Sequence, residues 1–126
     1  VFDAEYTDSA GLTTHSVRKL QPRHRQAEHY SDMSGIEKAS HGTAEGGATV
    51  GFTDDGDWIA FTPYELSTAK TLTARVSSAG PGGSLEVRAG SATGTLLGTA
   101  DVSPTGDWET FVDAKADLAD APAGTT

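Results

Sequence analysis

The fold is decided by the stretch Thr71-Leu72-Thr73-Ala74-Arg75-Val76-Ser77. Its apolar residues alternate with polar ones, which places them on one face of an extended strand and the polar residues on the other. Five other short apolar runs are separated by turn residues, and they lie at 49–52, 58–61, 84–88, 95–102 and 108–112. Regularly spaced short strands with turn signals between them predict an all-β fold, a β-sandwich of the jelly-roll kind.

No stretch of the chain favours a helix strongly. Asp113–Asp120 has a weakly helical composition, but a loop or an irregular strand accounts for it equally well. Residues 1–20 alternate in the same way as the strands, and a turn-like Asp8–Gly11 divides them, so they predict a β-hairpin. We interpret residues 1–21 either as the tail of a preceding immunoglobulin-like domain or as strands of the same domain, and 22–126 as the main module.

Composition narrows the possible partners. The 126 residues suffice for one domain and its core. Nine Lys and Arg against eighteen Asp and Glu give a net charge of −9, which disfavours nucleic acid and anionic membranes. No apolar run approaches the roughly 18–20 residues of a membrane span. The absence of cysteine removes disulfides and thiolate chemistry, and we expect any export signal to lie outside this sequence.

Three aromatic residues lie close to predicted turns. Phe52 precedes an acidic turn, Trp58 follows it, and Trp108 follows Thr105-Gly106-Asp107. A place in the core is the simpler expectation for Phe52 and Trp58, whereas the position of Trp108 at the edge of a loop favours partial exposure. Exposed rings near loops suit sugar recognition, because the C–H face of a pyranose packs on a flat aromatic ring.

The acidic turn and the histidines are weaker signals. Asp54-Asp55-Gly56-Asp57 predicts a tight hairpin turn with positive φ at Gly56. A glycosidase needs two carboxyl groups facing each other across a cleft, so a solvated turn explains these residues more simply than catalysis. Calcium is a second option for the carboxylates. The four histidines, His15, His24, His29 and His41, show no paired metal spacing, and no zinc site is predicted.

An ordered series of motifs runs from residue 26 to the end of the chain. It consists of QAEHYSDMSGI (26–36), GGATVGF (46–52), DDGDWI (54–59), GSLEVR (83–88), GTLLG (94–98) and TGDW (105–108). The series resembles a family 6 carbohydrate-binding module. The resemblance implies a β-sandwich that binds polysaccharide without cutting it, and residues 1–21 resemble the end of a β-domain that often precedes such modules.

The resemblance also implies two sugar sites. In the first, two rings at the loop end pinch a sugar, and the matching positions are Phe52 and Trp108, with Tyr commoner than Phe at the first. Trp58 matches a second site on a concave sheet face. A glutamate often found there falls on Ala39, and Glu37 or Lys38 could take its place.

The same family carries a structural calcium ion. The matching ligands are Gln26 and Glu28, with backbone oxygens and an aspartate on a last strand. In the family, a further apolar strand, a glycine-rich turn and that last strand follow the position of Thr126, and they also supply an asparagine that bonds the sugar. Relative to this pattern the calcium shell and the loop-end site are incomplete, and we expect the sequence to be a fragment of a larger protein.

The predicted function is non-catalytic carbohydrate binding that targets a larger secreted enzyme to a β-linked polysaccharide such as β-glucan or xylan. An extracellular location follows from this function. The alternative is a structural or assembly β-module that pairs with another chain through an open sheet edge. A small glycosidase or lyase built on the acidic turn is a third hypothesis, and no catalytic residue is assigned.

Overall fold

The computed structural model describes residues 2–7, 9–11, 13–18, 23–62 and 64–122. Its regular elements are ten strands and two short 3-10 turns. In chain order they are β1 (Phe2–Thr7), β2 (Thr13–Arg18), η1 (Ala27–His29), β3 (Asp32–Ser34), β4 (Glu37–Ser40), η2 (Glu45–Gly47), β5 (Ala48–Gly51), β6 (Trp58–Ala60), β7 (Thr71–Val76), β8 (Gly83–Ala89), β9 (Thr95–Val102) and β10 (Val112–Asp117). In this part of the chain no helix has the length and apolar character needed to cross a membrane.

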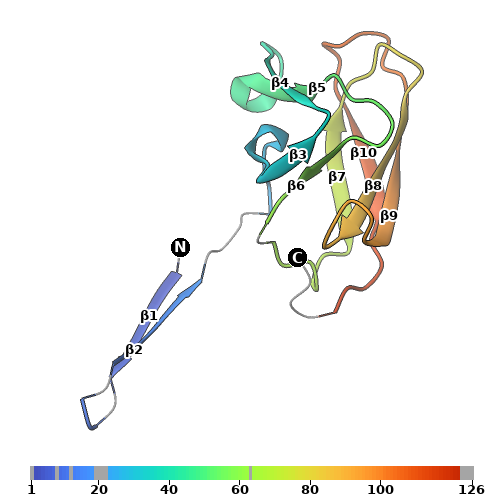
Figure 1. The fold of residues 1–126 in the computed structure, drawn as a ribbon. Helices are drawn as coiled ribbons and strands as arrows, with labels where there is room; N and C mark the ends of the chain where they lie inside the picture. Colours follow the sequence, from blue (N-terminus) through green and yellow to red (C-terminus); the bar gives the residue numbers. More distant parts are fainter. Residues whose placement is uncertain (1, 8, 12, 19–22, 63, 123–126) are drawn as a thin grey trace.

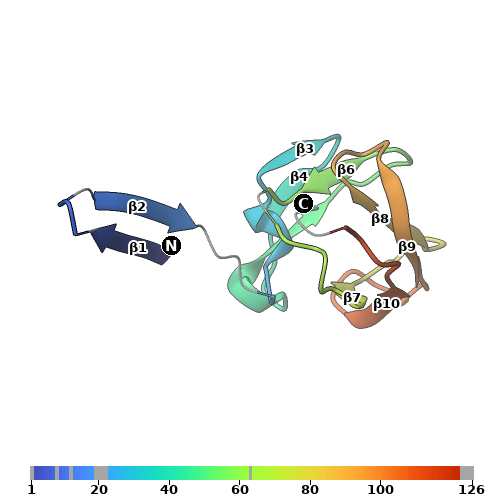
Figure 2. The ribbon, with the colours of Figure 1, turned by 90° about the horizontal axis from the view of Figure 1, so that it is seen from below.

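All the strand pairs are antiparallel. β3 pairs with β6, β4 with β5, β7 with β10 and β8 with β9, and β10 also packs beside β9. Figures 1 and 2 show β3 to β6 on one side of the main body and β7 to β10 on the other. The predicted all-β sandwich is therefore confirmed.

The centre of the sandwich is made of small side chains. Ala100, Ala114 and Ala116 are buried, and partly buried aliphatic side chains of β7, β9 and the segment after β10 pack around them. The alternation in β7 follows the sequence pattern, since Leu72 is partly buried while Thr71 and Thr73 are exposed. The predicted strand is thus confirmed together with its inward face.

The amino-terminal hairpin is also present. β1 and β2 pair in an unbroken register from Phe2 opposite Arg18 to Thr7 opposite Thr13. Figure 1 shows this hairpin extending away from the main body. Whether it belongs to a preceding domain stays a prediction.

Two details of the predicted strands are wrong. The run 108–112 is not a strand, because the Asp107 carboxylate binds the backbone just after it and holds a bend; β10 begins only at Val112 and occupies most of Asp113–Asp120. The acidic turn does not close a hairpin either. β5 and β6 each pair with another strand, so the turn connects two sheets instead.

Candidate functional site

Phe52 directly follows β5 and has an unusual backbone conformation. Its φ is 57°, and it is the one non-glycine residue with positive φ in the described part of the chain. Such a conformation costs energy for a bulky side chain and is found where the surrounding structure demands it. The ring is 72% exposed, so the expectation of a core position was wrong for Phe52. An exposed ring on a strained residue marks this position as a candidate contact for a ligand.

Trp108 lies on the loop between β9 and β10 and is 60% exposed, as its place at the edge of a loop predicted. Its backbone is firmly held. The hydroxyl of Ser77 donates a hydrogen bond to the carbonyl of Trp108 at 3.0 Å. This bond joins the Trp108 loop to the loop that follows β7, and Figure 1 shows the two loops side by side at the top of the sandwich.

Asp107 organises the same loop. Its carboxylate accepts hydrogen bonds from the backbone N–H groups of Glu109 (2.9 Å) and Thr110 (2.6 Å) and from the Thr110 hydroxyl (3.2 Å). These bonds, led by the one from the Thr110 hydroxyl, lower the pKa of Asp107 below its ordinary value of 3.8. The charged carboxylate therefore keeps the backbone on the far side of Trp108 in a fixed bend.

Thr105 fixes the near side of the loop. Its hydroxyl accepts a hydrogen bond from Ser78 N–H at 2.9 Å and lies 2.8 Å from the carbonyl oxygen of Asp107, to which it donates. Ser78 is buried, and its carbonyl accepts from Thr105 N–H at 2.8 Å. The indole of Trp108 is thus a solvent-facing ring on a constrained backbone.

Trp58 occupies a different setting. It is partly buried at the start of β6, where it pairs with Ser34 of β3. It lines a shallow cavity of about 110 Å³ together with Ile36, Val50, Thr53, Asp57, Ile59 and Leu85. The sequence expectation of a core position fits Trp58 better than Phe52, and one part of its indole still faces the cavity.

The acidic turn beside Trp58 is closed by its own residues. Asp57 N–H donates to the carbonyl of Asp54 at 3.2 Å, and Asp54 N–H donates to the Asp57 carboxylate at 2.7 Å. Gly56 has a φ of 91°, as the turn requires. One of the three carboxylates is therefore used to hold the turn. This arrangement is a structural turn and does not provide the facing pair of acids that glycoside hydrolysis needs.

Glu37 lies on the strand that pairs with β5, opposite the residue next to Phe52 in the chain. It is exposed on β4 and pairs with Gly51, the residue before Phe52. Lys38, the other candidate substitute, is engaged elsewhere, because its ammonium group sits 4.3 Å from the centre of the Tyr30 ring. The register of the β4–β5 pair therefore places Glu37 opposite the residue that precedes Phe52.

Gln26 and Glu28 converge on one glycine. A Cβ placed on Gly46, which has a φ of 80°, would lie 3.2 Å from Glu28 Oε1 and 3.5 Å from Gln26 Oε1. Glu28 is only 8% exposed, and no hydrogen bond or ion pair is found for its carboxylate within the described residues. A buried carboxylate without a partner is costly, and a carboxylate beside an amide oxygen suits a hard cation such as calcium.

These two side chains do not form a complete metal shell. Among the described residues there is no group of three or more His, Cys, Asp or Glu side chains that could hold a metal ion. The residues present fit a calcium ion in their chemistry, and further oxygen ligands would have to come from elsewhere in the protein or from water.

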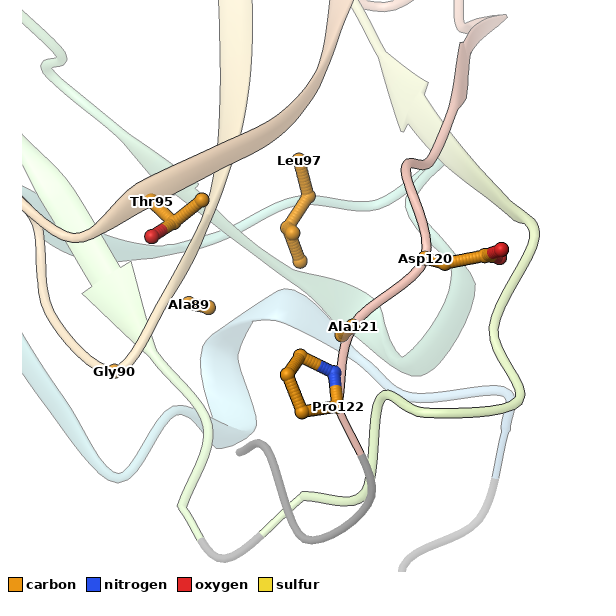
Figure 3. Close-up of a pocket in the computed structure, with 7 residues that line it drawn as sticks. All are labelled: Ala89, Gly90, Thr95, Leu97, Asp120, Ala121 and Pro122. Carbon is orange, nitrogen blue, oxygen red and sulfur yellow. The ribbon is translucent and has the colours of Figure 1, made fainter.

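Another cavity, larger than the one beside Trp58, is lined by none of these groups. Figure 3 shows it between the β8–β9 turn and the segment after β10, with a volume of about 370 Å³. Its lining is Ala89, Gly90, Thr95, Leu97, Asp120, Ala121 and Pro122. The Asp120 carboxylate points away from the cavity and pairs with Lys70, which lowers its pKa. Among the described residues no aromatic ring and no pair of acids lines this space, so they offer little chemistry there.

An all-β sandwich with aromatic rings exposed on its loops is typical of a carbohydrate-binding domain. The sequence matches the carbohydrate binding module family 6 over residues 26–126. The chain therefore belongs to this family, and it is a non-catalytic module that binds carbohydrate.

Solved structures support the same assignment. A family 6 carbohydrate-binding module from Clostridium cellulolyticum, in complex with xylose, is 39% identical with a TM-score of 0.72, and the match covers 79% of this chain and 76% of that one. A β-1,3-glucan binding family 6 module from Bacillus halodurans is 35% identical with a TM-score of 0.69, covering 79% and 75% of the two chains.

The curated relatives are much longer proteins. Endo-1,4-beta-xylanase A of Thermoclostridium stercorarium is 29% identical over 86 residues, which is 68% of this chain and 17% of that protein. The chain thus spans less than a fifth of the length of this relative.

Proposed function

We propose that this module binds a β-linked polysaccharide, a xylan or a β-glucan, by stacking sugar rings on Phe52 and Trp108. The observation that carries the proposal is the exposure of both rings on constrained backbone, one strained and the other held by hydrogen bonds on both sides. A constrained backbone lowers the conformational entropy that the site loses when a sugar binds. Solved relatives in complex with xylose or described as binding β-1,3-glucan support the substrate class.

The binding of one chain is expected to be modest. A stacked ring contributes about 0.5–1.5 kcal/mol beyond its buried area, and each hydrogen bond to a hydroxyl adds about 1 kcal/mol. These gains have to exceed the cost of immobilising the sugar, which leaves micromolar to millimolar affinity. Glu37 is our candidate for a polar contact beside Phe52, and Trp58 for a second sugar contact at its shallow cavity.

We further propose that Gln26 and Glu28 bind a structural calcium ion. The support is the buried Glu28 carboxylate, for which no hydrogen bond or ion pair is found within the described residues, and the convergence of both side chains over Gly46. Bound calcium would neutralise the carboxylate and stabilise the segment around η1 against the β4–β5 pair, which it already contacts.

The proposed role in the whole protein is to hold a carbohydrate-active enzyme on an extracellular polymer. Its support is the xylanase to which the module is related. A polymer of this kind is too large to cross a membrane, so the module has to meet it outside the cell.

The test is calorimetry or affinity electrophoresis of the chain against xylan, laminarin, cellulose and agarose. We expect binding to xylan or to a β-glucan, and its loss in Phe52→Ala and Trp108→Ala, which remove a stacking face each. Leu96→Ala is the matched control, because Leu96 is also an exposed large apolar residue but lies at the opposite end of β9 from the Trp108 loop. Binding that survives both ring variants would refute the proposal.

A second candidate function is assembly through sheet edges. The described strands form sheets of only two strands each, and several large apolar side chains are exposed, including Leu85, Leu96 and Val112. Open edges beside apolar surface favour pairing with another chain. This function would be compatible with sugar binding at the loops.

A further inference from the structure

A cluster of three polar side chains includes the residue that follows Trp108. His41 and Thr43 lie on the segment between β4 and η2, and Glu109 follows Trp108. The Thr43 hydroxyl lies 3.2 Å from the backbone carbonyl of Glu109, 3.2 Å from its Oε2 and 3.3 Å from His41 Nδ1. The cluster therefore joins the β4–β5 hairpin to the loop that carries the indole.

His41 is the least exposed member. Its side chain is 15% exposed, its Nε2 lies 3.5 Å from Glu109 Oε1, and its ring meets Phe111 edge-on at 5.3 Å. Its backbone N–H donates to the carbonyl of Gly47. Glu109 is the charged group found to face this imidazole among the described residues, since the nearby Glu45 pairs with His24.

We propose that His41, Thr43 and Glu109 position Trp108 for sugar binding, and that protonation of His41 tightens the arrangement. The inference rests on the proposed function. The three residues are positioning residues: they fix the backbone next to the indole, so that the ring is already oriented when the sugar arrives. Preorganisation of this kind raises affinity by lowering the ordering cost of binding.

The number of protons available for hydrogen bonds in the cluster explains why its order should depend on the protonation of His41. The Thr43 hydroxyl has one proton and faces three acceptors when His41 Nδ1 is unprotonated. A protonated imidazole donates from Nδ1 to Thr43 and from Nε2 toward Glu109, which frees the hydroxyl proton for the Glu109 carbonyl or carboxylate. Of the four contacts, protonated His41 and the Thr43 hydroxyl can together supply a proton to three, whereas neutral His41 and the hydroxyl can supply only two. The cluster therefore gains one hydrogen bond when His41 is protonated.

The positioning is tested first without a sugar. The two tryptophans, labelled with 5-fluorotryptophan, give two ¹⁹F resonances, which Trp58→Phe assigns. We expect Thr43→Val to shift or broaden the Trp108 resonance and to leave the Trp58 resonance in place. Thr43→Ser keeps the hydroxyl and should restore the original signal. Because Thr43 and Glu109 are exposed, the melting midpoint of Thr43→Val should differ from that of the wild type by no more than about 3 °C.

Affinity is then measured by calorimetry with xylohexaose and laminarihexaose. Thr43→Val should weaken binding of the recognised sugar by about three- to tenfold, the effect of one hydrogen bond, and Thr43→Ser should not. Wild-type affinity should be higher in acidic than in alkaline buffer, because acid favours the protonated imidazole. His41→Gln should abolish this dependence, because neither hexasaccharide has a titratable group.

The outcomes separate the inference from the proposed function. If Trp108→Ala abolishes binding while Thr43→Val changes neither the Trp108 resonance nor affinity, the inference is wrong and the proposed function stands. If Trp108→Ala leaves binding intact, the proposed stacking on Trp108 fails, and an unchanged fluorine spectrum in Thr43→Val would overturn the positioning role as well. A pH profile that persists in His41→Gln would remove His41 from the cluster's role.

Discussion

Phe52 combines two unfavourable features: a backbone conformation that is strained for a bulky residue, and an apolar ring exposed to solvent. A bulky residue in the left-handed region costs roughly 1–2 kcal/mol, and an exposed phenyl ring recovers little of this by burial. Glycine would satisfy the backbone at no steric cost. The presence of phenylalanine is therefore better explained by contact with a ligand than by stability.

Phe52→Gly separates these two effects. We expect the free energy of unfolding to rise by about 1 kcal/mol, because the strain is relieved, while sugar binding is lost with the ring. Chemical denaturation and calorimetry measure the two quantities on the same sample. Phe52→Tyr is the control, since it keeps both the ring and the strain and should bind sugar at least as well. A glycine variant that is less stable and binds normally would contradict this account.

At the scale of elements, the loop between β9 and β10 depends on one carboxylate. Asp107 bonds two backbone N–H groups and a hydroxyl beyond Trp108, and its pKa is lowered by these bonds. A group whose pKa is lower in the folded state stabilises the fold above its ordinary pKa. That contribution is lost as the pH falls through the lowered value.

We therefore expect the Trp108 loop to keep its order from pH 7 to pH 5 and to lose it only below about 3.8. Tryptophan fluorescence in a Trp58→Phe background measures this transition. Asp107→Ala should loosen the loop at every pH. Asp107→Asn keeps one acceptor oxygen and should hold the loop without the acid transition. A transition unchanged in Asp107→Asn would assign it to another group.

The segment of η1 gives a prediction about metal ions. If Glu28 binds calcium, saturating the site at about 100 times Kd should stabilise the fold by about 2.7 kcal/mol, and EDTA should reverse this. Glu28→Gln removes the buried charge, so it should raise the melting midpoint in EDTA and abolish the response to calcium. Equal wild-type midpoints in calcium and in EDTA would show that no structural calcium is bound.

At the scale of the whole molecule, the sandwich has a shallow core. Its buried apolar residues are mostly alanines, and none of the large side chains described is fully buried. Exposed Leu85, Leu96 and Val112 add apolar surface on β8, β9 and β10. Small cores give small margins of stability, and association with another chain is one way to increase them.

Association can be measured directly. If sheet edges pair between copies, the mass from light scattering should rise with concentration, and Leu96→Lys should shift the equilibrium toward the monomer, because a charge on β9 opposes pairing. Lys115→Ala, an exposed change on β10, is the control. A constant monomer mass across the concentration range would remove self-association as a function.

The sequence by itself determined the all-β class and the inward face of β7, because alternation with period two is a local property of the chain. The ordered motifs also determined the family, and a loop position correctly predicted the exposure of Trp108. The positive φ of Gly56 could also be predicted from the sequence, because a turn of this type is encoded by its own residues.

Features that depend on residues far apart in the sequence could not be predicted before the fold was known. β5 and β6 pair with other strands rather than with each other, and the backbone turns at Phe52 so that its ring faces solvent. The contact of Thr43 with Glu109 joins residues 66 positions apart. Spacing along the chain carries no signal for such pairs, because strand pairing and loop packing depend on distances that the whole fold sets.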